Sequence, residues 1–207
     1  MYERYIKRAL DVLISLVSLI ALSPLFLLIA LLIKLDSRGP VIFRQKRYGR
    51  HRQLFEIYKF RTMRTDTPSD VPTNDLRGAG SYITPLGKVL RKTSLDELPQ
   101  LWNILKGDMA LIGPRPALWN QYDLMELRDK YGASDICPGL TGWAQVNGRD
   151  YLSRDLEKKA RRDGEYASHI TFWFDIKVFL LTLVKVVNRQ GIVEGAQTDS
   201  PQTEDQK

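Results

Sequence analysis

The longest apolar segment of the chain covers residues 12–33 and contains no charged side chain. A helix of this length would be about 33 Å long, enough to cross the hydrocarbon core of a bilayer. Ser23-Pro24 interrupts the segment near its middle. Proline inside a helix removes one hydrogen bond and clashes with the preceding turn, which predicts a bend here. The Ser23 hydroxyl is a local partner for a backbone carbonyl freed by the bend.

Basic residues flank the apolar segment on both sides. They are Arg4, Lys7 and Arg8 before it, and Lys34, Arg38, Arg44, Lys46 and Arg47 after it. Basic flanks prefer the cytoplasmic side, so both ends favour the same side of a membrane. A helix that enters, turns at Ser23-Pro24 and returns would satisfy both preferences. On these residues alone, the re-entrant hairpin and the straight span stay equally open.

The next pattern predicts a β-hairpin. Residues 40–45 and 54–60 are rich in β-branched and aromatic side chains, and Tyr48-Gly49-Arg50-His51 between them indicates a turn. We expect Lys59, within the second strand, to be held rigidly toward a site. Residues 65–81 are rich in Thr, Asp, Pro and Gly and predict a loop, either functional or disordered.

A short amphipathic helix is predicted next, because apolar residues recur at helical spacing. These residues are Leu98, Leu101, Trp102 and Leu105. Ser94 and Glu97 have the spacing of a capping box, and Pro99 is tolerated only near a first turn. Both signals place Asp96 and Glu97 at the start of this helix.

Asp96 and Glu97 are the candidate catalytic pair. Adjacent side chains on a helix diverge by about 100°, so these carboxylates are poorly arranged to share a proton. They suit two separate tasks, one attacking a substrate and the other holding a metal. The ordinary alternative is that both only complement the helix dipole, a surface effect of about 0.3–1 kcal/mol.

Arg115 is the candidate anion-binding residue outside this stretch. It lies between Pro114 and Pro116, which restrict its backbone. Its planar guanidinium suits bidentate binding of a phosphate. The alternative is a rigid turn that carries a solvated arginine.

The C-terminal third predicts helices and one glycine-rich segment. We expect a polar surface helix at 118–131, a loop that closes over a ligand at 137–150, and a charged helix at 151–166. Residues 170–189 are amphipathic, which fits a helix in the membrane interface or an ordinary core helix. Residues 191–207 are polar, and we expect them to be disordered.

Composition narrows the chemistry. The 207 residues predict one domain, and the net charge of +7 indicates an anionic partner: nucleic acid, acidic lipid or a phosphorylated substrate. Cys137 is the only cysteine, and His51 and His169 are the only histidines, so a zinc cluster or a histidine-based triad is not expected. Any catalysis would therefore use carboxylates, basic groups and a metal ion.

Five motifs in this order and spacing resemble one family. They are Tyr58–Met63, Ser94–Leu101, Lys106–Met109, Gly113–Pro116 and Pro138–Arg149. The chain resembles the small bacterial polyprenyl-phosphate phosphoglycosyl transferases of the monotopic type, also called initiating sugar transferases, from Met1 to about Arg189. The resemblance implies the minimal catalytic form of that family.

The resemblance also implies a reaction: sugar-1-phosphate moves from a UDP-sugar to polyprenyl (undecaprenyl) phosphate, with Mg²⁺ as cofactor and UMP as product. It implies Asp96 as the nucleophile that forms a covalent intermediate and Glu97 as the magnesium ligand. The other implied roles are phosphate binding by Arg91 and Arg115, an active-site lysine at Lys59, contacts to the nucleotide sugar from Asn147 and Arg149, and the helix break at Ser23-Pro24.

Together these inferences predict a mainly helical α/β, monotopic membrane protein with a re-entrant helix hairpin, a short β-hairpin and interfacial amphipathic helices. We expect a re-entrant membrane helix at 1–36, a catalytic domain at 37–190 and a tail at 191–207. The expected location is the bacterial inner membrane, with the catalytic domain facing the cytoplasm. Expected partners are a UDP-sugar, polyprenyl phosphate and membrane lipid but not nucleic acid; a homodimer and the identity of the sugar are left open.

Two other functions fit parts of the sequence. In a membrane-anchored metal-dependent phosphohydrolase, Asp96 and Glu97 would both bind the metal and water would attack. In a non-catalytic protein, the basic charge would bind nucleic acid or acidic lipid, with a strong dependence on salt. The second alternative leaves the Asp-Glu pair and Arg115 without a role.

Overall fold

The computed structural model describes residues 2–68, 71, 76, 78–148 and 155–188. Its fold is α/β and mainly helical, as predicted. The helices are α1 (Lys7–Ala21), α2 (Ser23–Asp36), α3 (Ala79–Tyr82), α4 (Pro85–Lys92), α5 (Gln100–Lys106), α6 (Tyr122–Lys130), α7 (Trp143–Val146), α9 (Leu156–Ala167) and α10 (Phe172–Val187). The strands are β1 (Ile42–Tyr48), β2 (Leu54–Phe60), β3 (Ala110–Ile112) and β4 (Gly139–Thr141). The expected tail at 191–207 lies outside the described residues.

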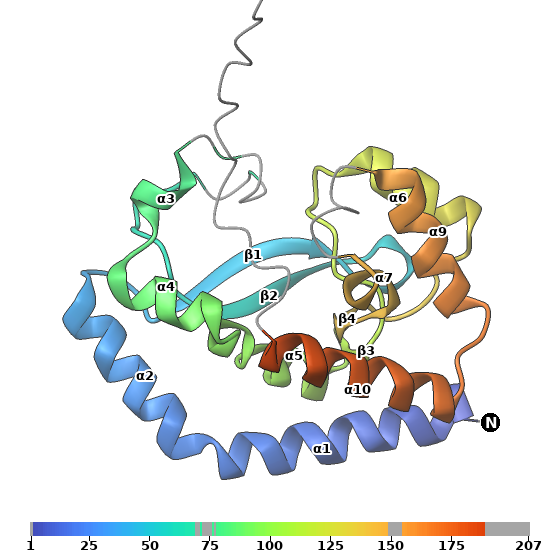
Figure 1. Ribbon diagram of the computed structural model, residues 1–207, viewed down its shortest axis with the longest axis horizontal. Helices are drawn as coiled ribbons and strands as arrows, with labels where there is room; N and C mark the ends of the chain where they lie inside the picture. The colour runs from blue at the N-terminus through green and yellow to red at the C-terminus, as the bar shows by residue number, and fades with distance from the viewer. Residues whose placement is uncertain (1, 69–70, 72–75, 77, 149–154, 189–207) are drawn as a thin grey trace, which may run out of the picture.

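The β1–β2 ribbon crosses the middle of the molecule, with α3 and α4 toward one end and α6 and α9 toward the other (Figure 1). Helices α1 and α2 run along one edge, and α10 lies beside α1. The strands of the ribbon are antiparallel, with Ile42 opposite Phe60 and Tyr48 opposite Leu54. The predicted hairpin is therefore confirmed.

The predicted break in the apolar segment is present. Helices α1 and α2 meet at Leu22 with a bend of 62°. The Ser23 hydroxyl donates to the Ile20 carbonyl (2.8 Å), the acceptor that the missing N–H of Pro24 leaves without its helical donor. Among the described residues, no single helix is long and apolar enough to cross a membrane; α1 and α2 meet that requirement only together, as a bent pair.

Helix α1 turns its polar side inward. Lys7, Asp11 and Ser15, spaced at i, i+4 and i+8, are buried. On the opposite side, Val17 is 56% exposed and Ile20 is 67% exposed. A surface helix of a water-soluble protein has the reverse arrangement.

The buried polar side of α1 joins this helix to the rest of the protein. Lys7 Nζ lies 2.8 Å from the Asp175 carboxylate of α10. Arg8 donates to the Ile104 carbonyl (2.6 Å) and to the Leu105 carbonyl (3.0 Å), in the last turn of α5. These bonds satisfy carbonyls that a helix C-terminus leaves unpaired.

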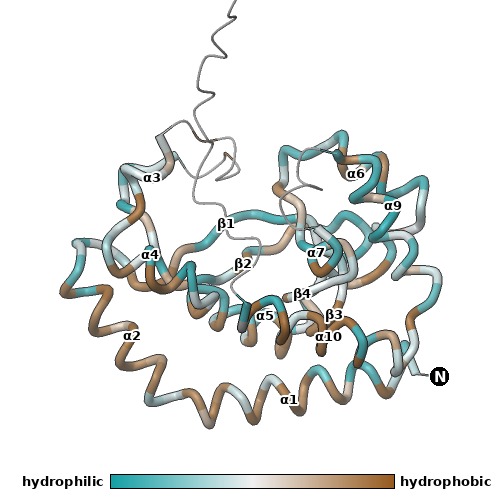
Figure 2. The backbone as a smooth tube through the Cα atoms, in the orientation of Figure 1, coloured by the Kyte–Doolittle hydropathy of each residue, from teal (hydrophilic) through white to brown (hydrophobic). Residues whose placement is uncertain are grey.

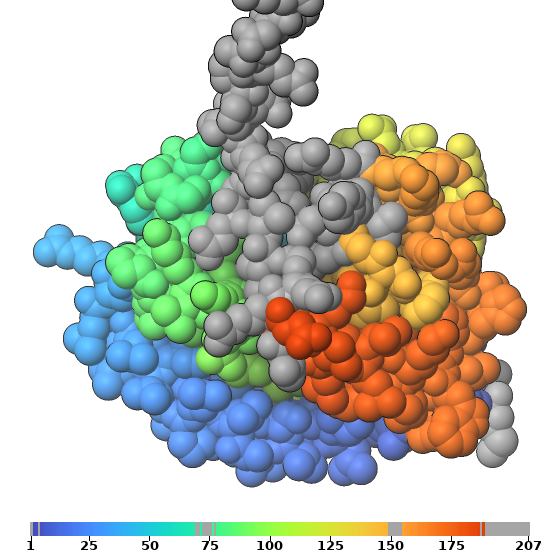
Figure 3. All heavy atoms as spheres, viewed as in Figure 1, coloured from blue at the N-terminus to red at the C-terminus, as the bar shows by residue number. Residues whose placement is uncertain are grey.

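Helices α2 and α10 also expose large apolar side chains. The predicted amphipathic helix at 170–189 is confirmed as α10, and Leu180 and Val184 from its apolar stripe are 54% and 55% exposed. Apolar residues dominate the α1–α2 edge of the molecule (Figure 2). In the space-filling view this edge is continuous along α1 and α2, with α10 directly beside it (Figure 3).

Residues 137–148, the described part of the glycine-rich segment predicted as a loop at 137–150, contain a strand and a helix instead. Residues Gly139–Thr141 form β4, which pairs in parallel with β3, and α7 follows it. A Cβ on Gly139 would clash with the Gly113 backbone, and a Cβ on Gly142 would clash with the Gly113 carbonyl. The prediction was wrong because these glycines permit two backbones to approach closely, instead of loosening the chain.

Candidate active site

Asp96 and Glu97 lie in a single 3₁₀ turn, Leu95–Glu97, between α4 and α5. The predicted capping box is wrong, since Ser94 adopts a left-handed conformation (φ 56°) and its side chain makes no capping bond. Helix α5 begins only at Gln100, with Pro99 as its N-cap residue. The carboxylates therefore precede the α-helix, and their turn begins at a residue whose backbone conformation is unfavourable for a non-glycine side chain.

The buried side of α5 also differs from the prediction. Trp102 is 54% exposed, whereas Ile104 and the polar Asn103 are fully buried. The Asn103 amide accepts a hydrogen bond from the Tyr58 N–H (3.0 Å) and donates to the Glu56 carbonyl (2.7 Å). A polar residue occupies this position because it satisfies the edge of β2, which hydrophobic periodicity alone does not indicate.

Among the described residues, two cations bind the Glu97 carboxylate. Lys59 Nζ donates to Glu97 Oε1 at 2.8 Å, and Arg115 Nη2 donates to the same oxygen at 3.0 Å. The Glu97 side chain is 12% exposed, and that of Lys59 is 17% exposed. Lys59 is held on β2, as predicted. It lies near Arg115, which is 56 positions later in the sequence.

Asp96 is buried beside the same cations. Burial raises the pKa of the Asp96 carboxyl above its usual range, while the nearby Lys59 and Arg91 lower it. Glu97 raises this pKa further, and Arg115 opposes that effect. Burial outweighs these cations, so ionisation of Asp96 depends on how many of them remain beside it.

The turn that carries Arg115 is anchored at three successive backbone carbonyls. Each carbonyl accepts one hydrogen bond from another part of the chain. The bonds are Gly139 N–H to Pro114 (2.9 Å), Arg128 Nη2 to Arg115 (3.0 Å) and Arg47 Nη1 to Pro116 (3.0 Å). The turn is thus fixed by long-range contacts as well as by its two prolines.

Three cations near the site were missed by the sequence analysis. Arg128 is buried and paired with Asp163, Arg47 is held by the Gln45 side chain, and Lys159 lies close to both arginines and to Arg115. Arg47 was counted only as a basic flank of the apolar segment. The i, i+4 spacing of Lys159 and Asp163 on α9 is the one local pattern that indicates a charge interaction among these residues.

Asn147, one of the two residues predicted to contact the nucleotide sugar, forms no hydrogen bond with Asp96 or Glu97 in the described part of the chain. Asn147 is exposed at the end of α7, where its amide donates to the Trp143 carbonyl (2.8 Å). Arg149 lies outside the described residues.

The carboxylates fit a magnesium ion that is shared with a substrate. No group of three or more His, Cys, Asp or Glu side chains within the described residues is placed to hold a metal by itself. Mg²⁺ commonly binds one or two carboxylates together with substrate phosphates, and Asp96 and Glu97 supply such oxygens. The donor chemistry is thus compatible with Mg²⁺, without a complete protein cage.

Comparison with known proteins assigns the chain to a family. The family model described as bacterial sugar transferase matches residues 2–189. The chain is similar to an undecaprenyl-phosphate glucose phosphotransferase of Komagataeibacter xylinus (41% identity over 189 residues, covering 87% of this chain and 36% of that protein). It is also similar to a UDP-glucose:undecaprenyl-phosphate glucose-1-phosphate transferase of Escherichia coli K12 (42% over 193 residues, 88% and 40%).

The chain spans well under half the length of these two relatives. It covers 90% of a third, the uncharacterized sugar transferase EpsL of Bacillus subtilis, at 38% identity over 189 residues, which are 90% of this chain. The match of the family model runs from the first helix through α10 and includes both carboxylates and all the cations described above. The chain belongs to the bacterial sugar transferase family.

Proposed function

We propose that this protein is a phosphoglycosyl transferase that moves sugar-1-phosphate from a UDP-sugar to polyprenyl phosphate through a covalent intermediate on Asp96. The observation that carries the proposal is the convergence of Lys59 and Arg115 on Glu97, directly beside the buried Asp96. A carboxylate attacks a diphosphate poorly unless cations offset the repulsion between the two anions. The names of the relatives supply the substrate class.

The chemistry has two displacement steps. In the first, an Asp96 carboxylate oxygen attacks the phosphorus that carries the sugar, the bond from that phosphorus to the bridging oxygen breaks, and UMP leaves with the electron pair. In the second, a phosphate oxygen of the polyprenyl carrier attacks the same phosphorus and the bond to Asp96 breaks. The carboxylate is regenerated, and polyprenyl-diphosphate-sugar is released.

The cations divide the work of these steps. Lys59 and Arg115 hold Glu97 and face the transferred phosphoryl group, while Arg91 lowers the pKa of Asp96 and so favours its nucleophilic form. Glu97 would hold Mg²⁺ together with the diphosphate oxygens. When bound, Mg²⁺ neutralises charge on the diphosphate.

The surface of the protein supports a proposal for its placement in the membrane. We propose that α1 and α2 form a re-entrant hairpin in the bacterial inner membrane and that α10 lies in the interface, with the catalytic part facing the cytoplasm. Support comes from the 62° bend and from the exposed apolar sides of the three helices. An active site at this depth could bind both a water-soluble nucleotide sugar and the phosphate of a membrane lipid.

The test uses purified full-length protein in lipid nanodiscs with a panel of UDP-sugars, Mg²⁺ and polyprenyl phosphate. Transfer should release UMP only in step with lipid product, apart from one enzyme equivalent without acceptor. A UDP-sugar labelled in the phosphate next to the sugar should label the protein in that single turnover. Continuous acceptor-free release would indicate a hydrolase, and no release would indicate a binding protein.

Asp96→Asn should reduce transfer by at least about 10³-fold and abolish labelling of the protein. The matched control is Asp66→Asn, because Asp66 is an exposed carboxylate paired only with Arg64 in the described structure. Full activity in Asp96→Asn would remove this residue from the nucleophile role.

A further inference from the structure

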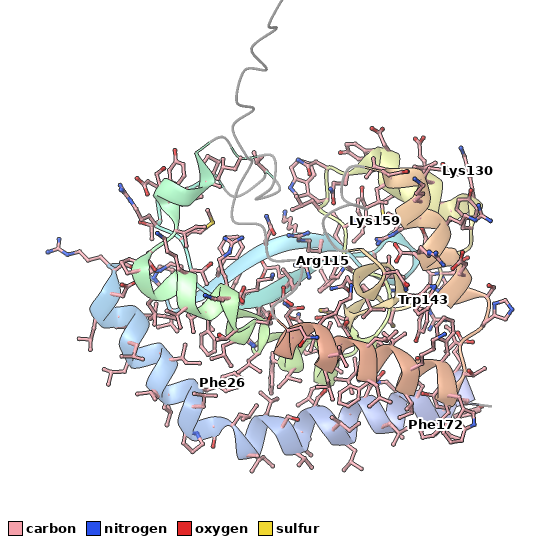
Figure 4. The ribbon with its side chains drawn as sticks, viewed as in Figure 1. Phe26, Arg115, Lys130, Trp143, Lys159 and Phe172 are labelled. Carbon is pink, nitrogen blue, oxygen red and sulfur yellow. The ribbon has the colours of Figure 1, made fainter. Side chains whose placement is uncertain are left out.

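Four basic side chains from four different parts of the chain lie close together near Glu97. They are Arg47 on β1, Arg115 on its proline-flanked turn, Arg128 on α6 and Lys159 on α9, called here the basic cluster. Figure 4 shows Arg115 and Lys159 close to each other beside the β1–β2 ribbon. Such a concentration of like charge is unfavourable unless anions balance it.

The three arginines of the basic cluster already have partners. Arg115 donates to Glu97, and Arg128 donates to Asp163 through both Nε (2.9 Å) and Nη2 (2.6 Å). Arg47 is held at Nε by Gln45 (3.0 Å) and at Nη1 by the Pro116 carbonyl. These contacts hold the three guanidinium groups in fixed positions near Glu97.

Lys159 differs from the arginines. In the part of the chain that the structure describes, its amine forms neither an ion pair nor a hydrogen bond. The neighbouring Lys158, by contrast, is exposed and paired with Asp155 (3.0 Å). Lys159 is thus a cation that the fold keeps near the reaction site without a described anionic partner of its own.

The electrostatic surroundings of Lys159 favour an anion beside it. Burial, and next the charge of Arg128, lower the pKa of the Lys159 amine to about 8. Asp163 opposes this shift but is already engaged by Arg128, while Arg115 and Arg47 add to it. An anion bound at Lys159 would stabilise the charged amine and raise this pKa again.

We propose that Lys159 binds the phosphate of the departing nucleoside monophosphate, next to Arg115. This inference rests on the proposed function. The sugar-bearing phosphorus faces Asp96, Lys59 and Arg115, so the second phosphate of the substrate needs a cation beyond them. That second phosphate leaves as UMP, which gains negative charge when the bridging bond breaks, and a cation at this position stabilises the charge as it develops.

The experiment measures UMP binding to the full-length protein in nanodiscs by calorimetry, with uridine as the phosphate-free probe. Lys159→Met should weaken UMP binding about 10- to 100-fold, the effect of losing a hydrogen bond between charged groups. Lys159→Arg should bind UMP within about threefold of the wild type, and uridine binding should be equal in all variants. Lys158→Met is the matched control on the same helix and should behave as the wild type.

Turnover provides a second readout. Lys159→Met should raise the KM for the UDP-sugar and weaken product inhibition by UMP together, which a merely structural role would not do selectively. Wild-type affinity for UMP should also fall as the pH rises above about 8, because the free amine loses its proton, whereas Lys159→Arg should not show this decline. This comparison remains available if Lys159→Met fails to fold.

The outcomes separate the two proposals. If the wild type neither binds UMP nor releases it from any UDP-sugar, the proposed function fails. If the wild type does both, and folded Lys159→Met binds UMP within twofold of it, the role of Lys159 is overturned while the transferase assignment stands. An equal pH dependence in wild type and Lys159→Arg would also overturn the role of Lys159.

Discussion

Removing one partner of the buried ion pair between Arg128 and Asp163 should destabilise the protein more per residue than removing both. Their side chains are 4% and 1% exposed, and two hydrogen bonds join them. Removing one member of such a pair leaves a buried charge without compensation, which costs about 3–5 kcal/mol. Arg128→Met or Asp163→Leu should therefore lower the unfolding midpoint by about 6–20 °C in a protein of this size.

The double variant Arg128→Met/Asp163→Leu provides the decisive comparison. Because it leaves no buried charge behind, it should be less destabilised than the sum of the single variants by about 0.5–3 kcal/mol. Thermal unfolding in one detergent, followed by circular dichroism, measures all three variants. The control is Arg64→Leu, which removes an exposed pair with Asp66 and should cost about 0–1 kcal/mol. Single variants as stable as this control, or a strictly additive double variant, would refute the reasoning.

Three further predictions concern the backbone and the membrane segment. Gly139→Ala should prevent folding because the new Cβ meets the Gly113 backbone, whereas Gly80→Ala, with open space around it, should be neutral or stabilising; expression and midpoint measure both. Asn103→Leu should cost about 1–3 kcal/mol for each backbone group it leaves unpaired, and a midpoint unchanged from the wild type would contradict this. Pro24→Ala should restore the helical N–H and reduce the bend between α1 and α2. A cysteine placed near the N-terminus should then become less accessible to a thiol reagent added on the cytoplasmic side. Unchanged labelling of this cysteine would contradict the prediction.

Local patterns were sufficient to predict the features that depend on neighbouring residues. The break at Ser23-Pro24 and the antiparallel ribbon each have a signal within a few positions, and the structure contains both. The helix start predicted at Ser94 was wrong, because Asp96 and Glu97 lie in a 3₁₀ turn ahead of α5. The left-handed conformation of Ser94 was not predictable, because a Ser-x-x-Glu spacing has the same appearance whether or not the cap forms.

The features that were missed depend on contacts between distant residues. The Gly113 and Gly139 backbones approach closely and join two segments that the sequence pattern predicts as separate loops. The pairing of Arg128 with Asp163 likewise links two polar helices that appear solvent-exposed when each is considered by itself. Hydrophobic periodicity identifies which side of a helix is apolar, but it cannot identify a buried ion pair.

The carboxylate of Asp175 has a consequence for how the protein is made. It accepts hydrogen bonds from Tyr2 (2.7 Å), Lys7 (2.8 Å) and Tyr166 (2.6 Å), so the first and last described helices share one buried centre. The N-terminal helix leaves the ribosome well before Asp175 has been synthesised. In the proposed re-entrant arrangement, the helix hairpin would therefore be available to enter lipid before the folding of the rest of the chain is complete, and synthesis at the membrane would be part of the folding pathway.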